Sequence, residues 1–223
     1  MGGGRLSLEP SYYPDFAIFR DIYLRQVYRT DYRGAYVLDL GSHKGYFAVY
    51  ALMHDAKMVE CFEPSSRNFA ALRQTVASTA EFQNRVRLHQ AAVGARDGLA
   101  QLHVYERSWS HSLIERPDAR QTCVEQVAIR EFAGVLEACP PEDDARIIVK
   151  MDIEGAECDV LLNTALESLT RMDELFLETH TFGPCDRQCL INRMEQIGFT
   201  ARRMQDPDVF HFQREQGQGA VRR

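Results

Sequence analysis

From residue 36 onward, short apolar runs alternate with segments in which apolar residues recur every three to four positions. The apolar runs predict strands at 36–40, 58–62, 86–90, 147–151 and 174–178. The helical segments lie at 44–53, 65–76, 131–138, 156–169 and 187–197. An alternation at 101–105 is typical of a hairpin or edge strand, and strands at 199–204 and 209–212 close the chain around a turn at 206–208. The pattern predicts an α/β fold with a doubly wound, mostly parallel sheet, to which the closing hairpin adds one antiparallel strand.

Residues 12–33 carry the pattern of one more helix, which precedes the first strand. Its apolar positions recur at spacings of three and four and are Tyr12, Phe16, Phe19, Tyr23 and Val27. This helix packs on the main domain, and it could also form a wall of a substrate pocket. We therefore expect an N-terminal helical extension (1–35), one domain (36–213) and a polar, frayed tail (214–223).

The composition is that of an ordinary globular protein. Of 223 residues, 45% are hydrophobic and 26% are charged, which excludes intrinsic disorder and fibrous repeats for the bulk of the chain. No run of 18 apolar residues exists, so we expect no membrane-spanning helix. The first residues lack the apolar core of a signal peptide, and we expect a cytoplasmic protein.

The charge balance limits the kind of partner. The 26 lysines and arginines and the 32 acidic residues give a net charge of −6, whereas a nucleic-acid binder usually carries a basic stripe. The balance therefore argues against a nucleic-acid partner. Arginines make up 23 of the basic residues, and they suit carboxylate or phosphate pairing better than Schiff-base chemistry.

The cysteines show no pattern of a metal site. There is no Cys-x-x-Cys. Cys185 and Cys189 are one helical turn apart, but no histidine and no second cysteine pair stands at zinc-ligand spacing from them. We interpret all of them as reduced thiols. They are Cys61, Cys123, Cys139, Cys158, Cys185 and Cys189.

The first strand runs into a glycine-bearing turn and then a helix. Gly41 permits close approach of a ligand to the backbone, and Gly45 permits a tight start of the helix. Ligands of open parallel sheets bind beyond the carboxyl ends of the strands. A dinucleotide fingerprint would have glycine at position 43, where this chain has His43. Asp39 would repel a pyrophosphate but can accept hydrogen bonds from an ammonium group, so the segment is either a cofactor loop or a plain strand–helix turn.

The second strand ends in an acidic residue. Glu63 follows Asp39 by 24 positions and precedes Pro64, which stops the strand. A carboxylate there can accept hydrogen bonds from both hydroxyls of a ribose. Its other interpretation is a charge at a helix N-terminus, which is common. The coincidence with the glycine turn favours the cofactor interpretation.

Further polar groups follow the two later apolar strands. Lys150, Asp152 and Glu154 project to one side if their strand persists, because side chains alternate along a strand. Carboxylates at such a place can act as a base, bind a metal or cap a helix. Glu178 and His180 stand at the end of the next strand, where an imidazole is either structural or catalytic.

Five segments together resemble the FkbM family of S-adenosylmethionine-dependent methyltransferases over residues 18–205. They are 37–45, 62–64, 91–94, 149–157 and 178–180, and the Lys-x-Asp-x-Glu-Gly-Ala-Glu string from Lys150 is the most specific. The resemblance implies a seven-stranded, Rossmann-like sheet of the class I methyltransferase type. It also implies S-adenosylmethionine as cofactor and methyl transfer to hydroxyl oxygens of small natural products or sugars. His43 and Lys44 depart from the family's usual loop, which carries small or amide residues there.

The resemblance also implies which residues bind the cofactor. Asp39 and Gly41 would face its amino-acid end, with His43 and Gly45 in the same loop. Glu63 would bind the ribose hydroxyls, assisted by Ser65 and Asn68. Gln90 and Ala91 would border the adenine, and Asp152 would lie under the sulfonium.

The acceptor hydroxyl must lose its proton during methyl transfer. Asp152 and His180 are our candidates for the base, and His111 in the 107–124 loop is a third. We slightly favour His180, because a neutral imidazole suits proton transfer near pH 7. We expect no divalent metal, since Glu157 lies past Gly155 on the helix and caps or pairs locally.

The predicted function is O-methylation of a small molecule or a glycosylated metabolite, as in natural-product biosynthesis. Three alternatives stay open: a ribose O-methyltransferase acting on nucleic acid, a Rossmann-fold oxidoreductase, and a non-catalytic binding protein. The sequence identifies neither the acceptor nor the oligomeric state.

Overall fold

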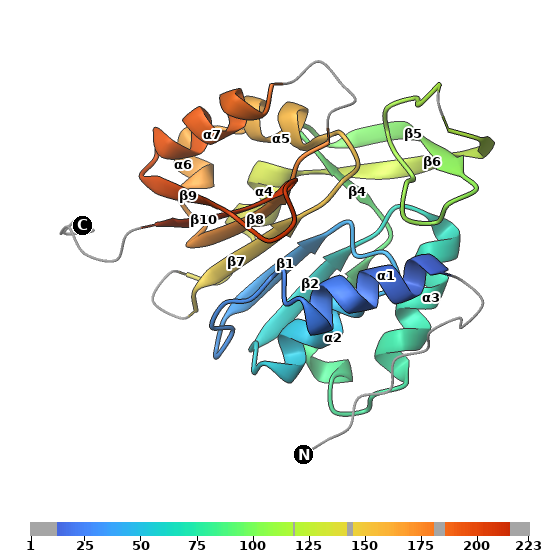
Figure 1. Cartoon of the computed structure of the whole chain (residues 1–223), viewed down its shortest axis with the longest axis horizontal. Helices are drawn as coiled ribbons and strands as arrows, with labels where there is room; N and C mark the ends of the chain where they lie inside the picture. Colours follow the sequence, from blue (N-terminus) through green and yellow to red (C-terminus); the bar gives the residue numbers. More distant parts are fainter. Residues whose placement is uncertain (1–12, 118, 142–144, 181–185, 215–223) are drawn as a thin grey trace.

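A computed structural model describes residues 13–117, 119–141, 145–180 and 186–214 of the chain. Its main sheet has seven strands in the order β3-β2-β1-β7-β8-β10-β9 (Figure 1). The strands are β1 (Tyr36–Leu40), β2 (Met58–Phe62), β3 (Val86–His89), β7 (Ile147–Met151), β8 (Glu174–Glu178), β9 (Phe199–Arg203) and β10 (Val209–Arg214). The first five of these pair in parallel, and β10 runs antiparallel to both β8 and β9. The predicted doubly wound sheet with one antiparallel strand is confirmed.

The two central strands are buried on both faces along their full length. Each is apolar except for one charged residue, Asp39 in β1 and Lys150 in β7. These residues are register partners, and Lys150 Nζ lies 3.6 Å from Asp39 Oδ1. Burying a charge costs free energy unless an opposite charge lies nearby. The pairing of Lys150 with Asp39 offsets part of this cost for both side chains.

Helices cover both faces of the sheet (Figure 1). The N-terminal segment, α2 (Tyr46–Met53) and α3 (Ser66–Ala77) enclose one apolar cluster that includes Val37, Val59 and Ile148. On the other face lie α4 (Phe132–Glu137), α5 (Glu157–Asn163), α6 (Leu166–Leu169) and α7 (Arg187–Glu195). A short 3₁₀ turn, η2 (Gln83–Arg85), precedes β3.

A second, three-stranded sheet was not predicted. It consists of β4 (Ala92–Gly94), β6 (Gln121–Glu131) and β5 (Gly98–Tyr105) in that order. The alternation at 101–105 is confirmed as part of β5, but β6 was not predicted: its first residues were placed in the 107–124 loop and its last residue at the start of the 131–138 helix. Only Val127 of β6 is fully buried, so the strand carries no alternating apolar signal by which it could be recognised.

Two predicted helices are shorter than expected. The N-terminal one consists of α1 (Tyr13–Phe19) and a π-helical turn, η1 (Arg20–Leu24), and helix ends before Gln26, whose φ is +52°. The helix predicted over residues 12–33 is therefore wrong for residues 25–33, which are irregular. The helix expected over 156–169 is divided into α5 and α6 by an extended Thr164. Tyr12, residues 142–144 of the predicted loop and tail residues 215–223 lie outside the described residues.

The prediction that every cysteine is a reduced thiol is wrong for Cys158, which is in a disulfide. Sequence spacing does not report which cysteines approach each other in the fold. Cys61, Cys123, Cys139 and Cys189 are free thiols, and Cys185 lies outside the described residues. Within the described ranges, no helix is long and apolar enough to cross a membrane.

Candidate active site

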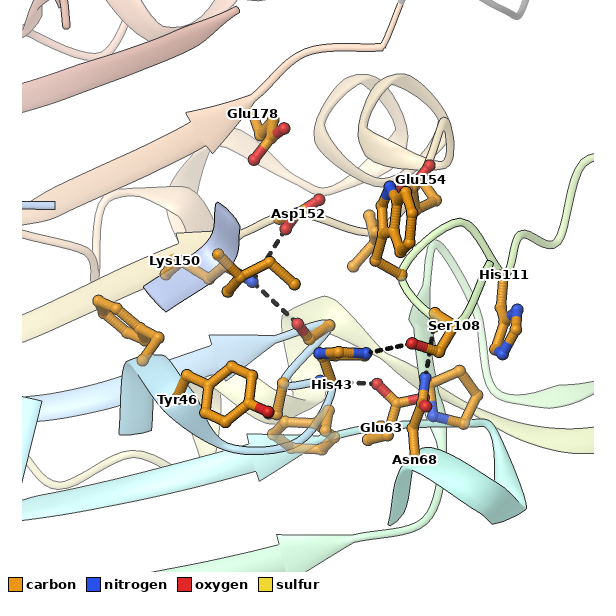
Figure 2. A pocket seen from close by; sticks show the side chains of 18 of the residues that line it. His43, Tyr46, Glu63, Asn68, Ser108, His111, Lys150, Asp152, Glu154 and Glu178 are labelled. Carbon is orange, nitrogen blue, oxygen red and sulfur yellow. Dashed lines mark hydrogen bonds and ion pairs between the residues drawn. The ribbon is translucent and has the colours of Figure 1, made fainter. Parts of the chain in front are cut away.

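A pocket lies at the carboxyl ends of β1, β2, β7 and β8, where open α/β sheets bind ligands (Figure 2). The N-terminal segment and the loops around residues 41–43, 63–64, 108–113, 152–156 and 206 contribute to its walls. Polar groups gather at its two ends. Glu63 and Asn68 lie at one end, and Asp152 and Glu178 lie at the other. We call these the Glu63 end and the acid end.

The glycine loop between β1 and α2 separates the two ends. Gly41 has φ of +78°, and a Cβ atom on it would lie 1.8 Å from the backbone oxygen of Asp152. Gly45 has φ of +86°, and a Cβ atom there would lie 2.6 Å from a methyl carbon of Leu72. Both positions therefore require glycine, which permits the loop to pass close to β7 and α2 to pack against α3.

Glu63 is almost completely buried beneath the glycine loop. Its carboxylate accepts one hydrogen bond from the backbone N–H of His43, at 2.8 Å, and one from that of Ser65, at 2.9 Å. Burial raises the pKa of Glu63 to about 7, although these two donors act in the opposite direction. Each oxygen keeps a lone pair, so the carboxylate can accept further hydrogen bonds from a ligand.

His43 is neutral in this setting. Burial, with the nearby charges of Lys44 and Lys150, lowers the pKa of the imidazole to about 3. Its Nε2 atom forms a 2.9 Å hydrogen bond with Ser108 Oγ, and its buried Nδ1 atom has no hydrogen-bond partner among the described residues. Asn68 donates a hydrogen bond to Ser108 O at 2.8 Å, so the 106–112 loop is held over the Glu63 end.

Lys150 is the cation at the centre of the acid end. Its Nζ atom donates a hydrogen bond to Gly41 O at 2.8 Å and lies 3.2 Å from Asp152 Oδ2, as well as near Asp39. Burial alone would lower the pKa of Lys150, but the charges of Asp152, Asp39 and Glu178 raise it above its ordinary value. Lys150 therefore keeps its charge and ties β7 to the glycine loop.

Asp152 and Glu178 point toward one another from the ends of neighbouring strands (Figure 2). The charge of Asp152, together with burial, raises the pKa of Glu178 above its ordinary value. Tyr28 donates a hydrogen bond to Glu178 Oε2 at 3.2 Å. Two carboxylates that share a site in this way can hold a proton near neutral pH.

His180 lies beside this pair and is held from behind by Glu157. Nδ1 of His180 is 2.9 Å from Glu157 Oε1, while Nε2 is 3.9 Å from Asp152 and 3.5 Å from Glu154. Burial would lower the pKa of His180, but the hydrogen bond to Glu157 and the surrounding carboxylates raise it to about 10. The expectation of a neutral imidazole near pH 7 does not match this environment, because the ring is protonated there.

The ligand atoms of Asp152, Glu178 and His180 all lie within 4.8 Å of one another. Two carboxylates and an imidazole are a donor set that divalent cations accept. In geometry, these residues could therefore hold a metal ion, provided that His180 loses its proton.

The N-terminal segment forms one wall of the pocket. Lys44 Nζ lies 2.8 Å from the buried carboxylate of Asp15, which fixes α1 to the glycine loop. Tyr23 donates a hydrogen bond to Tyr46 O at 2.8 Å. Ile18, Ile22 and Val27 supply apolar lining. The departure from the family pattern at Lys44 is thus explained by a contact with the N-terminal segment.

The structure brings together some of the predicted residues. Those that line the pocket are Gly41, His43, Glu63, Asn68 and Asp152. Those that do not are Asp39, Gly45, Ser65, Gln90, Ala91 and His180. Asp39 is sealed inside the sheet, and Gln90 is exposed, while Ala92 and Val93 line the wall that was expected from Gln90 and Ala91.

Several residues that line the pocket were not among the predicted catalytic or cofactor-binding residues. They are Lys150, Glu154, Glu178, Ser108, Tyr28 and Tyr46. The rule that placed Asp152 also applies to Glu178, because Asp152 follows the buried strand β7 and Glu178 is the last residue of the buried strand β8. His111 does line the pocket, but it lies near Asn68, far from Glu178 (Figure 2). Burial lowers the pKa of His111 to about 4, and its Nδ1 accepts a hydrogen bond from the backbone of Tyr105.

The solved structures that this chain matches include several methyltransferases. The methyltransferase FkbM of Methylobacillus flagellatus KT is 17% identical and has a TM-score of 0.52; the match covers 87% of this chain and 47% of that one. A precorrin-6y C5,15-methyltransferase of Geobacter metallireducens is 9% identical over 96% of this chain and 98% of its own, with a TM-score of 0.47. A protein of the NADB-Rossmann superfamily from Streptococcus agalactiae is 13% identical over 88% and 69%, with a TM-score of 0.49.

The M. flagellatus structure supports the Rossmann-like fold, and this chain spans about half of its length. Among curated proteins there is no match. A family model, that of the methyltransferase FkbM domain, matches residues 39–217. This match includes the glycine loop, Glu63 and the whole acid end. The chain therefore belongs to the FkbM methyltransferase family.

Proposed function

We propose that this protein transfers a methyl group from S-adenosylmethionine to a hydroxyl group of a small-molecule or sugar-containing acceptor. The observation that carries the proposal is the arrangement of the pocket. A buried carboxylate with free lone pairs lies at one end, and two neighbouring carboxylates, Asp152 and Glu178, lie at the other, where the charge of Asp152 raises the pKa of Glu178. Membership of the FkbM methyltransferase family supports the same conclusion.

The residues at the Glu63 end fit the cofactor. Glu63 can accept hydrogen bonds from two ribose hydroxyls while it keeps both of its backbone donors. His43 Nδ1 and Asn68 Oδ1 are buried polar atoms without hydrogen-bond partners among the described residues, as expected where a polar ligand completes a site. Gly41 leaves the loop open to a ligand because it has no side chain.

The residues at the acid end perform the proton transfer. S-adenosylmethionine supplies a methyl group on a positively charged sulfur, which is already a good leaving group. The chain must therefore orient the acceptor, exclude water and remove the hydroxyl proton. We assign proton removal to the Asp152–Glu178 pair: the O–H bond breaks and its proton passes to a carboxylate oxygen. The raised pKa of Glu178 matches this task better than an ordinary exposed carboxylate would.

His180 then has a different role from the base that the sequence favoured. A protonated imidazole cannot accept a proton, but it can stabilise the charge of Asp152 and Glu154, which lie 3.9 Å and 3.5 Å away. Glu157 fixes the ring, and it also accepts hydrogen bonds from the backbone N–H groups of Ile153 and Gly155. We therefore propose His180 as a positioning residue for Asp152.

The test combines binding with product analysis. Calorimetry should show that S-adenosylmethionine and S-adenosylhomocysteine bind to the protein. A metabolite extract incubated with the enzyme and methyl-labelled cofactor should then yield a product in which mass spectrometry locates the label on oxygen. Label on nitrogen or carbon would contradict the proposed O-methylation, and absence of cofactor binding would contradict the whole proposal.

A further inference from the structure

An arginine-rich groove lies beside the pocket. It has a volume of about 940 Å³. Residues 24–33, which begin at the last residue of η1, form one wall, and residues 202–205 at the end of β9 form the other. Five arginines line it, against a single acidic residue, Asp31. They are Arg25, Arg29, Arg33, Arg202 and Arg203. We call this feature the arginine groove.

Three of the five arginines are engaged within the protein. Arg25 pairs with Asp21 at 3.0 Å, and Arg33 pairs with Asp31 at 2.7 Å. Arg203 donates a hydrogen bond to the backbone oxygen of Pro207 at 2.9 Å. Each of these contacts lies within one wall of the groove. They leave the groove positively charged, because the partner of Arg203 is an uncharged carbonyl group.

The other two arginines are available to a ligand. The side chains of Arg29 and Arg202 are exposed and have no ion pair or hydrogen bond with any of the described residues. They come from different walls of the groove. Guanidinium groups bind phosphate and carboxylate oxygens through paired N–H donors, so two of them in one concavity favour an anionic ligand.

The charge of the groove contrasts with that of the protein. The chain has a net charge of −6, so a concavity with five arginines and one acid is a local reversal of sign. Concave surfaces of one charge focus the electrostatic potential and raise the local concentration of the opposite charge. The overall negative charge repels an extended polyanion, and this favours a small anionic molecule over a nucleic acid.

The groove borders the methyl-transfer pocket. Val27 lines both. On one wall, Asp21 and Ile22 face the pocket, and the groove begins two residues later. On the other wall, residues up to 205 line the groove, and Asp206 lines the pocket. The two concavities therefore adjoin along residues 22–27 and 205–206.

We propose that the methyl acceptor is a small molecule that carries an anionic group, a phosphate, sulfate or carboxylate, and that Arg29 and Arg202 bind this group in the arginine groove. The inference rests on the proposed function and names the class of acceptor for the same site. It assigns the groove the task of orienting the acceptor so that its hydroxyl reaches the Asp152–Glu178 pair.

The first test uses inorganic pyrophosphate as a probe of the groove. Calorimetry is carried out on the full chain saturated with S-adenosylhomocysteine. We expect pyrophosphate binding to be weakened about 10- to 100-fold in the Arg29→Gln, Arg202→Gln double variant, because two charge-assisted contacts are lost. Arg130→Gln is the control, since Arg130 is an exposed arginine on β6 of the second sheet. Equal affinity in the wild type and the double variant would overturn the proposal.

The second test examines the acceptor itself. The labelled product formed from a metabolite extract should be retained by an anion-exchange resin at pH 7. The double variant should show at least a tenfold loss of kcat/KM with the purified acceptor, while its affinity for S-adenosylhomocysteine stays within about twofold of the wild type. Arg130→Gln should match the wild type in both measurements.

The outcomes separate this inference from the proposed function. A neutral or cationic labelled product, or a labelled nucleic acid, would overturn the inference and leave methyl transfer standing. Failure of S-adenosylhomocysteine to bind the wild type would instead overturn the proposed function. An anionic product whose formation is unaffected in the double variant would also contradict the assignment of Arg29 and Arg202.

Discussion

The two ends of the pocket both bury carboxylates, but they compensate the charge in different ways. At the Glu63 end, one carboxylate receives two backbone N–H groups, from His43 and Ser65. At the acid end, the compensation comes from ionised side chains. Lys150 lies within 3.6 Å of both Asp39 and Asp152, and a protonated His180 lies near Asp152.

The different compensation of charge suits the two ends of the pocket to different tasks, ligand binding at one and proton transfer at the other. Backbone N–H groups are fixed dipoles that neither titrate nor move, so they preorganise Glu63 to accept hydrogen bonds from a ligand. Ionised side chains respond to each other, and like charges raise the proton affinity of a carboxylate. The Glu63 end is therefore suited to binding, and the acid end to moving a proton.

The largest expected effect is on the rate of methyl transfer. Asp152→Asn removes one member of the carboxylate pair, and we expect a rate about 10²- to 10⁴-fold lower, the usual cost of losing a general base. Single-turnover kinetics with bound cofactor measures this loss. The affinity for S-adenosylhomocysteine should stay within about threefold, and Asp159→Asn, at an exposed acid of α5, serves as control. If affinity falls as much as the rate, Asp152 is a cofactor ligand and the separation of the two ends fails.

The second effect is on stability. Lys150→Met leaves the buried carboxylate of Asp39 without its cation, and we expect the free energy of unfolding to fall by about 3–5 kcal/mol. Urea denaturation measures the change. Adding Asp39→Asn to this variant should restore part of the loss, because no uncompensated charge is then buried in the sheet. A loss below about 1 kcal/mol in the single variant would show that Lys150 is not the main compensation for Asp39.

The third effect is on cofactor affinity. Glu63→Ala removes the proposed acceptor of the ribose hydroxyls, and we expect a loss of roughly 2–3 kcal/mol, or about 30- to 150-fold in affinity for S-adenosylmethionine. Calorimetry on the folded variant measures it, with Glu81→Ala, at an exposed acid, as control. The single-turnover rate at saturating cofactor should stay within a few-fold of the wild type. Unchanged affinity would remove Glu63 from the cofactor site.

The sequence predicted the parts of the site that follow from strand ends. Gly41, Glu63 and Asp152 each come directly after a buried strand, and the carboxyl ends of parallel strands meet at one edge of a sheet. The main sheet was predictable for the same reason, because its strands are continuous apolar runs.

The remaining features depend on contacts that spacing does not encode. Lys150 meets Asp39 because β7 lies beside β1, an order that no local pattern specifies. The protonation of His180 results from three carboxylates that follow β7, two in the loop and Glu157 at the start of α5. The strand β6 was missed because its side chains are mostly exposed. Sequence reasoning could name donors and acceptors, but not the electrostatic environment that decides their protonation.

The fourth prediction concerns the pH dependence of stability. The pKa of His180 is about 10 in the folded protein, above its ordinary value of about 6.5. Its contribution is therefore fully present below pH 6.5 and is lost as the pH rises toward 10. Between pH 7 and 9, the stability advantage of the wild type over His180→Gln should shrink by about 2–3 kcal/mol, as measured by urea denaturation. A constant difference across this range would show that His180 is not protonated by its neighbours.

The smallest expected effect is that of metal removal. Asp152, Glu178 and His180 offer ligand atoms within 4.8 Å of one another, so the acid end must be tested as a metal site. However, Lys150 Nζ lies 3.2 Å from Asp152, and a protonated His180 has no lone pair on Nε2 to give to a metal. Positive charge is thus already supplied by side chains.

We therefore expect the methylation rate to stay within about twofold after dialysis against EDTA, and to be unchanged by added Mg²⁺, Ca²⁺ or Zn²⁺. The rate assay must be run near pH 7, where His180 is protonated, and again near pH 9.5, where competition by a metal for the imidazole is strongest. A rate that falls tenfold or more with EDTA and returns with one of these ions would contradict the prediction. In that case a cation, rather than Lys150 and His180 alone, compensates the carboxylates of the acid end, and the contrast with the Glu63 end becomes one between backbone dipoles and a bound ion.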